Sequence, residues 1–323
     1  MEKFILKIWY SNKIYYNIIS YLLLPLSFVY MLAFYIPRLF RVEYNVGIPV
    51  ICIGNINVGG TGKTSTLLSI VKQLSASGKK VCVLLRGYGG QKISFKKVLP
   101  SDSAQVTGDE AILYSNCVPT YIANNRKNAL IKIKEEISPD FIFLDDGFQD
   151  KSVFKDKNIL MVNGQRGFGN GLCLPAGPLR ELIKPAIKKA DFLIIVGEDD
   201  TRIDIKLKNT DIITYSAVIN VVNIDKNKNY LAFSGIGNNQ SFFNTLKQHD
   251  YSVFKTIEFP DHHYFSREDL DRLNKIAAAN NLTLITTEKD FVRIPKEIRR
   301  DIECLKIEIV LDKMNELINK LTN

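Results

Sequence analysis

Beyond residue 45, hydrophobic and polar positions divide the chain into short apolar runs separated by longer amphipathic segments. The runs are apolar throughout, which is typical of strands that are buried on both faces of a parallel sheet. The pattern therefore predicts an α/β core with a mostly parallel sheet and helices between its strands. The expected strands are 49–54, 80–85, 119–123, 140–145, 158–163 and 191–197, and the expected helices are 63–77, 109–116, 125–137 and 180–189.

A second, smaller α/β domain is expected toward the C-terminus. The stretch 198–229 is polar and rich in Lys, Asp and Asn, which is typical of a connector. Apolar patterning resumes after it, with strands expected at 230–237, 252–259, 282–287 and 303–311 and helices from about residue 240 and at 266–280. We therefore expect three parts: 1–42, 43–215 and 216–323.

The N-terminal part contains an apolar stretch, 14–36, without a charged side chain. Its length meets the roughly 20 residues that a membrane-spanning helix needs. Pro25, several tyrosines and basic residues on both flanks favour instead a helix that lies in the membrane interface. A full span and a buried core helix remain alternatives. A signal peptide is disfavoured because the run is too long and no A-x-A site follows it.

Composition and charge favour some classes of binding partner but do not select one. The 323 residues carry a net charge of +9, which favours an anionic partner such as a phosphorylated metabolite, an acidic membrane or a nucleic acid. The lysines are spread along the chain, and no nucleic-acid-binding motif is present, so we expect no nucleic-acid partner. The five cysteines form no C-x-x-C pair and are interpreted as reduced structural thiols.

The sequence NVGGTGKTS at 57–65 follows an expected strand and opens an expected helix, the context of a phosphate-binding loop. Asn57 stands where the P-loop pattern has its first glycine, and asparagine tolerates a left-handed turn. Lys63 would reach the β- and γ-phosphates of ATP, and the Thr64 hydroxyl would ligate Mg²⁺. The expected nucleotide-binding residues are Asn57, Val58, Gly59, Gly60, Thr61, Gly62, Lys63, Thr64 and Ser65.

A partner for this loop is the segment FIFLDDGFQ at 141–149, an apolar strand that ends in two carboxylates. Asp145 and Asp146 are the expected metal ligands, and either of them can hold the cation or its water. Helix capping is the alternative role for such a pair.

Two other nucleotide or phosphate chemistries fit less well. The loop is similar to that of membrane-associated partition ATPases, but the lysine which those proteins carry before the two glycines is replaced by Val58. The string DHH at 261–263 is also found in metal-dependent phosphoesterases, whose further Asp-rich and His-rich motifs are not found in this sequence.

Several segments together closely resemble the tetraacyldisaccharide 4′-kinase family, in order from the N-terminal apolar stretch to about residue 295. They are VGGTGKT (58–64), LLRGYGG (84–90), TGDEAIL (107–113), DDGFQ (145–149), GFGNGLCLPAGPLRE (167–181), FSGIGNNQSFFNTL (233–246), FPDHHYFS (259–266) and TTEKDFVRI (286–294). The resemblance implies transfer of the γ-phosphoryl group of ATP, with Mg²⁺, to the 4′-hydroxyl of an acylated glucosamine disaccharide 1-phosphate, which forms lipid IVA in lipid A biosynthesis. It also implies a RecA-like P-loop core, a smaller C-terminal α/β domain and an N-terminal helix at the cytoplasmic face of the bacterial inner membrane.

The resemblance also assigns residues. The Asp of the GDE motif, Asp109, takes the proton of the acceptor hydroxyl, and His262 of the DH motif supports it; from the residues alone, Asp109 could equally cap the helix 109–116. Arg180 is expected to meet a phosphate. The residues expected around the acceptor are Arg86, Tyr88, Gln149 and Glu181. His263 is expected to pack or to lie at the surface, and Lys289 and Arg293 are expected to organise the second domain.

Overall fold

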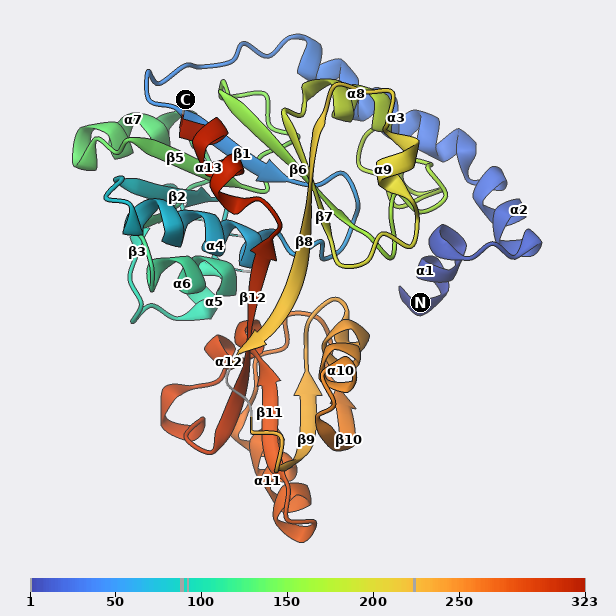
Figure 1. Ribbon diagram of the computed structural model, residues 1–323, viewed down its shortest axis with the longest axis vertical. Coiled ribbons are helices and arrows are strands. Elements are labelled where there is room, and N and C mark those ends of the chain that lie inside the picture. Colours follow the sequence, from blue (N-terminus) through green and yellow to red (C-terminus); the bar gives the residue numbers. More distant parts are fainter. Residues whose placement is uncertain (1, 88–89, 92, 223–224, 323) are drawn as a thin grey trace. The chain divides into compact units, whose positions relative to one another are not determined.

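The computed structural model describes residues 2–87, 90–91, 93–222 and 225–322 (Figure 1). Within it the chain forms two compact units, each assembled from separate stretches of sequence. Unit 1 consists of Met1–Cys82, Arg126–Val218 and Ile309–Asn323, and unit 2 consists of Val83–Asn125 and Ile219–Glu308. The domain limits expected from sequence, near residues 42 and 215, stay a prediction.

The strands of unit 1 lie in the order β8-β7-β6-β1-β5, and each neighbouring pair is parallel. Ile53 of β1 pairs with Asp145 of β5, which brings the carboxyl ends of these two strands to the same edge of the sheet. Every residue of β1, β5 and β7 is buried, as expected for strands covered on both faces. The bounds are β1 (Val50–Gly54), β5 (Phe141–Asp145), β6 (Lys157–Asn163), β7 (Phe192–Val196) and β8 (Ile213–Val222), of which β8 continues into unit 2.

Helices α4, α7 and α8 of unit 1 follow the expected positions with one shift. Helix α8 begins at Ile183 instead of residue 180, because the residues before it are bonded elsewhere. The Arg180 N–H donates to the carbonyl of Ile56 (2.6 Å), and the Leu182 N–H donates to the Tyr35 hydroxyl (3.2 Å). The bounds are α4 (Lys63–Ala76), α7 (Arg126–Ile137), α8 (Ile183–Lys189), α9 (Ile203–Lys206) and α13 (Met314–Thr322).

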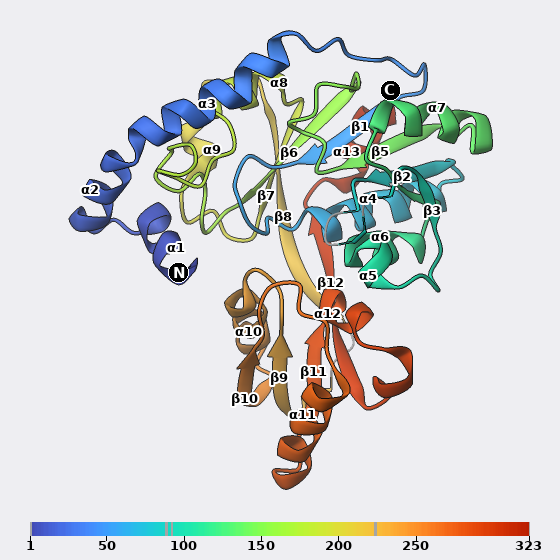
Figure 2. The ribbon, with the colours of Figure 1, turned by 180° about the vertical axis from the view of Figure 1, so that it is seen from behind.

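The N-terminal apolar stretch is broken where one continuous helix was expected (Figure 2). Helix α2 ends at Leu22 and α3 begins at Leu24, with a bend of 51° between them. Pro25 accounts for the break: it occupies the first turn of α3, and inside a continuous helix it would remove a hydrogen bond and clash with the preceding turn. The bounds are α1 (Glu2–Tyr10), α2 (Ile14–Leu22) and α3 (Leu24–Leu39).

Of the helices in the described part of the chain, none alone has the length and hydropathy to cross a membrane, whereas α2 and α3 taken together as a bent pair do.

Unit 2 contains a second parallel arrangement, in the order β10-β9-β11-β12. Residues alternate along β9: Leu231 and Phe233 pack in a cluster with α11, and Tyr230 and Ala232 pack in a cluster with α10. Both faces of β9 are therefore buried, whereas most residues of β10 are exposed. The bounds are β9 (Asn229–Ser234), α10 (Asn239–Gln248), β10 (Ser252–Glu258), α11 (Arg267–Ala279), β11 (Thr283–Thr287), α12 (Glu288–Arg293), the 3₁₀ turn η1 (Lys296–Ile298) and β12 (Ile302–Leu311), which continues into unit 1.

The stretch 83–125 belongs to the same unit as these C-terminal elements. Strand β4 pairs parallel with β2 and antiparallel with β3, and helix α6 packs against α12. The contact between α6 and α12 joins two regions of sequence more than 170 residues apart. The bounds are β2 (Val81–Leu85), β3 (Lys96–Val98), α5 (Ala104–Thr107), α6 (Asp109–Ser115) and β4 (Thr120–Ile122).

The polar stretch 198–229, expected to be a connector, contains helix α9 and strand β8. Strand β8 escapes the hydrophobic pattern because most of its residues are exposed or only half-buried. The short elements β3, α5 and α12 were not expected either. Their lengths of 3, 4 and 6 residues give too few positions for a periodic signal.

Candidate active site

The glycine-rich loop joins β1 to α4 in unit 1. Gly62 caps α4 with a φ of +80°, and Gly59 has a φ of +107°, conformations that residues with a Cβ atom rarely adopt. The N-terminus of the 14-residue helix α4 adds its partial positive charge to the backbone N–H groups of the loop. A turn of this kind has the geometry and charge to bind a phosphate group.

Asn57, at the position of the missing first glycine, is an anchor of the loop. It is buried, and its Nδ2 donates to the carbonyl of Gly167 (3.0 Å). The next residue, Val58, donates its N–H to the carbonyl of Pro178 (2.9 Å). Asn57 is not among the described residues with a positive φ, so the tolerance for a left-handed turn that we attributed to it is not used. The loop dispenses with glycine here because it is tied to the segment 167–181 instead.

Asp146 lies between two cations at the end of β5. Its carboxylate is 3.3 Å from Lys63 Nζ and accepts from Arg180 Nη1 at 3.1 and 3.0 Å. Burial raises the pKa of the Asp146 carboxyl, but Lys63 and Arg180 outweigh it and hold that pKa at about 2. The carboxylate is therefore ionised at neutral pH and keeps both cations at the mouth of the loop.

The residues expected to hold Mg²⁺ have suitable chemistry for that ion. Thr64 and Asp145 are buried beside the loop and supply a hydroxyl and a carboxylate, which are the oxygen ligands that a hard cation prefers. Among the described residues there is no cluster of three or more His, Cys, Asp or Glu side chains that could hold a metal ion by themselves. The donor set fits a cation whose other ligands are phosphate oxygens and water.

Gln149 and Glu181 belong to a hydrogen-bond network that includes Asn55, which lies two residues before the loop. Gln149 Nε2 donates to the Asn55 carbonyl (2.7 Å) and to Glu181 Oε1 (3.0 Å). Glu181 is buried and also accepts from Lys189 Nζ, at 2.9 and 2.7 Å for its two oxygens. Lys63 Nζ is part of the same network, since it donates to Asn55 Oδ1 (3.1 Å).

The segment 167–181 also receives the N-terminal helices. Trp9 Nε1 donates to the Pro175 carbonyl (3.0 Å), and Tyr30 donates its hydroxyl to the Arg180 carbonyl (3.0 Å). Ser27 is buried, donates to the Cys173 carbonyl (2.9 Å) and accepts from the Ala176 N–H (3.1 Å). The polar side chains of these helices therefore face the segment that anchors the phosphate loop.

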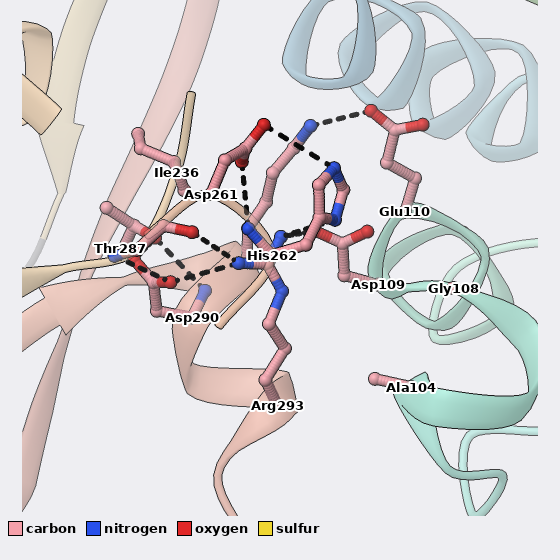
Figure 3. A network of polar contacts seen from close by, with 12 residues as sticks. Ala104, Gly108, Asp109, Glu110, Ile236, Asp261, His262, Thr287, Asp290 and Arg293 are labelled. Atoms are coloured by element: carbon pink, nitrogen blue, oxygen red, sulfur yellow. Dashed lines mark hydrogen bonds and ion pairs between the residues drawn. The ribbon is translucent and has the colours of Figure 1, made fainter. Parts of the chain in front are cut away.

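In unit 2, Asp109 begins helix α6 and is buried. The N-cap of this helix is Gly108, with a φ of +84°, so the alternative in which Asp109 caps the helix is wrong. The Asp109 side chain instead accepts from Arg293 Nη2 (Figure 3). One residue further, Glu110 accepts from Lys289 Nζ (2.6 Å), so two ion pairs tie α6 to α12.

His262 lies beside Asp109 in the same network (Figure 3). Its φ of +57° is unusual for a residue with a side chain, and it is held by two acceptors for its N–H, the Gly235 carbonyl (3.0 Å) and Asp261 Oδ1 (2.9 Å). His262 Nδ1 is 3.3 Å from Arg293 Nη2. His263 points elsewhere: it contacts Asp269 Oδ2 (2.9 Å) and stacks on Phe259, in agreement with the packing role expected for it.

Arg293 is the residue whose importance the sequence did not reveal. We expected it only to organise its domain, but it contacts both Asp109 and His262. No local motif marks this role, because the three residues come from α6, a loop and α12. Of the other expected acceptor residues, Arg86 directly follows β2 and is exposed, and Tyr88 lies outside the described residues.

Fold and loop place the chain in a class of α/β proteins whose glycine-rich strand-to-helix turn can hold a phosphate. Comparisons with known proteins then identify its family. The family model described as "Tetraacyldisaccharide-1-P 4'-kinase" matches residues 19–323, and this chain belongs to that family.

Individual relatives agree with this assignment. The tetraacyldisaccharide 4′-kinases of Rickettsia akari and Rickettsia canadensis are each 36% identical to this chain over 94% of both lengths. A crystal structure of LpxK from Aquifex aeolicus, described as an "apo" form in complex with ATP, is 26% identical, with a TM-score of 0.76 over 94% of this chain and 100% of that one. The α/β fold expected from the hydrophobic pattern is thereby confirmed.

Proposed function

We propose that this chain transfers the γ-phosphoryl group of ATP to the 4′-hydroxyl of tetraacyldisaccharide 1-phosphate and so forms lipid IVA in lipid A biosynthesis. The observation that carries the proposal is the family match, which spans residues 19–323. Curated relatives of nearly equal length are named tetraacyldisaccharide 4′-kinases, and the Aquifex protein was crystallised with ATP.

In this proposal unit 1 is a RecA-like P-loop core that binds ATP through residues 57–65. Backbone N–H groups of the loop and the α4 N-terminus hold the phosphates, and Lys63 binds the β- and γ-phosphate oxygens. Arg180 is supported as a second phosphate ligand by its position opposite Lys63 on the Asp146 carboxylate. Its forked guanidinium matches the oxygens of a phosphate better than a lysine would.

Mg²⁺ would be held by Thr64, Asp145 and Asp146. When bound, the ion neutralises charge that develops on the transferred phosphoryl group. Because Asp146 pairs with Lys63 and Arg180, it also orients the two cations that meet the nucleotide.

In unit 2, Asp109 is the general base and His262 supports it. A sugar hydroxyl is a weak nucleophile, and a positioned carboxylate that accepts its proton raises its reactivity. The arrangement that supports this assignment is the close network of Asp109, Arg293 and His262 in Figure 3.

The acceptor side is assigned to Arg86, Tyr88, Gln149 and Glu181. The contacts of the last two support an indirect role: Glu181 is buried against Lys189 and Gln149, so it orients Gln149 beside the loop. Arg86 is exposed at the end of β2, and we assign its guanidinium to an anionic group of the acceptor.

The N-terminal helices lie on the cytoplasmic face of the bacterial inner membrane in this proposal. Ser20 and Ser27 of these helices are buried and form hydrogen bonds with the segment 167–181, whereas large apolar side chains of the helices are exposed. This is the reverse of the usual pattern for a soluble helix and suits contact with acyl chains. Lys13 and Arg41 flank the helices and can meet anionic headgroups. The outward residues include Ile14, Leu22, Leu26, Phe28, Val29, Leu39 and Phe40.

The direct test is an assay of the purified protein in detergent micelles with ATP, Mg²⁺ and tetraacyldisaccharide 1-phosphate. We expect a lipid product heavier by one phosphate, in an amount equal to the ADP released. ATP hydrolysis without a phosphorylated lipid, from a protein that is folded and binds ATP, would refute the assignment. Asp109→Asn is the matched control, since it should bind ATP and release little product.

A further inference from the structure

Arg293 ends helix α12, and its side chain is only 2% exposed. Its Nη2 contacts Asp109 Oδ2 and lies 3.3 Å from His262 Nδ1. Its Nη1 donates to the Gly235 carbonyl (2.7 Å) and to Asp290 Oδ1 (3.2 Å). The guanidinium thus has four partners from four places in the sequence, and two of them are the proposed base and its supporting histidine (Figure 3).

The guanidinium is itself held in place from below. Asp290 is buried and accepts from the Ser234 hydroxyl (2.9 Å), the Gly235 N–H (3.1 Å) and the Thr287 hydroxyl (2.7 Å). These neutral donors hold the Asp290 carboxylate in place, and its negative charge then attracts the guanidinium of Arg293. A side chain with so many fixed contacts has little freedom to choose another rotamer.

We propose that Arg293 is a positioning residue of the kinase reaction: it fixes Asp109 by its carboxylate and fixes His262 as the tautomer with its proton on Nε2. The proposal rests on the function proposed above. A guanidinium carries only N–H donors, so a nitrogen that bonds to it must be an acceptor. Nδ1 of His262 is therefore unprotonated, and the neutral ring carries its hydrogen on Nε2.

The same contact sets the roles of the two carboxylate oxygens of Asp109. Arg293 occupies Oδ2, and the acceptor hydroxyl then delivers its proton to Oδ1. The charged and titratable groups that face this network are Asp109 and Glu110 on α6, Asp261, His262 and Tyr264 in the loop, and Lys289 and Asp290 on α12.

A second ion pair between α6 and α12 differs from that of Arg293 in its exposure to water. The neighbouring pair of Lys289 with Glu110 joins the same two helices, but its side chains are 35% and 32% exposed. That pair is accessible to water and therefore contributes little to stability. Lys289→Met is therefore the matched control for Arg293, because it removes one ion pair between the same helices without touching Asp109 or His262.

The variant of choice is Arg293→Lys, because deleting the charge altogether would leave Asp109 and Asp290 buried without a cation and risks unfolding. Lysine keeps the charge but cannot bond in a fork to Asp109, His262, Asp290 and Gly235 at once. We expect kcat to fall by about 100-fold, the size of effect that a small misplacement of a catalytic group produces, while the KM for ATP stays unchanged. Lys289→Met should keep most of the wild-type kcat.

The deciding measurement is the ¹⁵N NMR spectrum of the histidine rings in the full-length wild-type protein, in which only three histidines have to be assigned. We expect His262 to show an unprotonated Nδ1 and a protonated Nε2, and we expect Arg293→Lys to lose this preference. A proton on Nδ1 in the wild type, or an Arg293→Lys variant with unchanged tautomer and unchanged kcat, would overturn the proposal. The spectrum needs no lipid, so its result is independent of whether the proposed acceptor is correct.

Discussion

The two glycines that flank helix α4 offer a matched test of the phosphate loop. Gly62 caps its N-terminus with a φ of +80°, and Gly78 follows its C-terminus with a φ of +84°. Replacement of either by alanine places a Cβ atom in a left-handed conformation, which costs about 1–2 kcal/mol. Both variants should therefore lose a similar amount of folding free energy.

The surroundings of the two glycines differ, so the two substitutions should differ slightly in their cost to stability and clearly in their effect on ATP affinity. A Cβ atom at Gly62 would lie 3.3 Å from Val196 Cγ1, whereas one at Gly78 has nothing within 4 Å. Gly62→Ala should therefore be slightly less stable than Gly78→Ala. It should also bind Mg·ATP at least about tenfold more weakly than the wild type, a loss of about 1.4 kcal/mol, because the strained turn moves the loop N–H groups away from the phosphates.

The assay is calorimetric titration of each variant with Mg·ATP, together with urea unfolding in the absence of nucleotide. Gly78→Ala should keep wild-type affinity, and Gly62→Asn should recover part of the affinity that alanine loses, since asparagine tolerates the left-handed region. If Gly62→Ala bound ATP as tightly as Gly78→Ala, the loop would not be the phosphate site and our account of unit 1 would be wrong.

Three further predictions concern the surroundings of the loop and the base. Ser27→Ala leaves the Cys173 carbonyl and Ala176 N–H without their buried partner and should cost about 1–3 kcal/mol in urea unfolding, whereas Ser69→Ala, which removes only a bond to the preceding helical turn, should cost little. The pKa of Asp146 is depressed from 3.8 to about 2, so the stabilisation by its carboxylate is complete above pH 4 and is lost as the pH falls toward 2. Because this side chain is 42% exposed, the loss in unfolding free energy should be about 1 kcal/mol. The Asp146→Asn variant should not show this loss of stability in acid unfolding. Asp109→Asn should lower kcat by about 10²–10⁴-fold and leave ATP affinity, measured by titration, unchanged; full turnover would exclude Asp109 as the base.

Much of unit 1 could be predicted from the sequence, because its strands are buried on both faces and read as continuous apolar runs. The loop at 57–65 could be recognised for a similar reason, since strand, turn and helix are adjacent in the chain and each has its own local signal. The break in the N-terminal helix was also marked locally, by Pro25, which we used as an argument against a membrane span but not to divide the helix.

The network around Asp109 could not be predicted in full. Asp109 is separated from His262 and Arg293 by more than 150 residues, and no periodic pattern shows that the stretch 83–125 joins the C-terminal elements in one unit. The family resemblance supplied Asp109 and His262, because motifs mark these positions. It did not supply the link through Arg293, which depends on how α6 packs against α12. Strand β8 was missed for a physical reason too, since a strand with so many exposed residues has no apolar run.

The proposed acceptor is the 4′-hydroxyl of the acylated disaccharide, and tandem mass spectrometry of the lipid product can locate the new phosphate on it. With ATP and Mg²⁺, we predict that the new phosphate is found on the sugar ring distal to the 1-phosphate, and that an acceptor lacking the 4′-hydroxyl gives no product. A phosphate at another position, or equal phosphorylation of the 4′-deoxy acceptor, would show that the 4′-hydroxyl is not the acceptor.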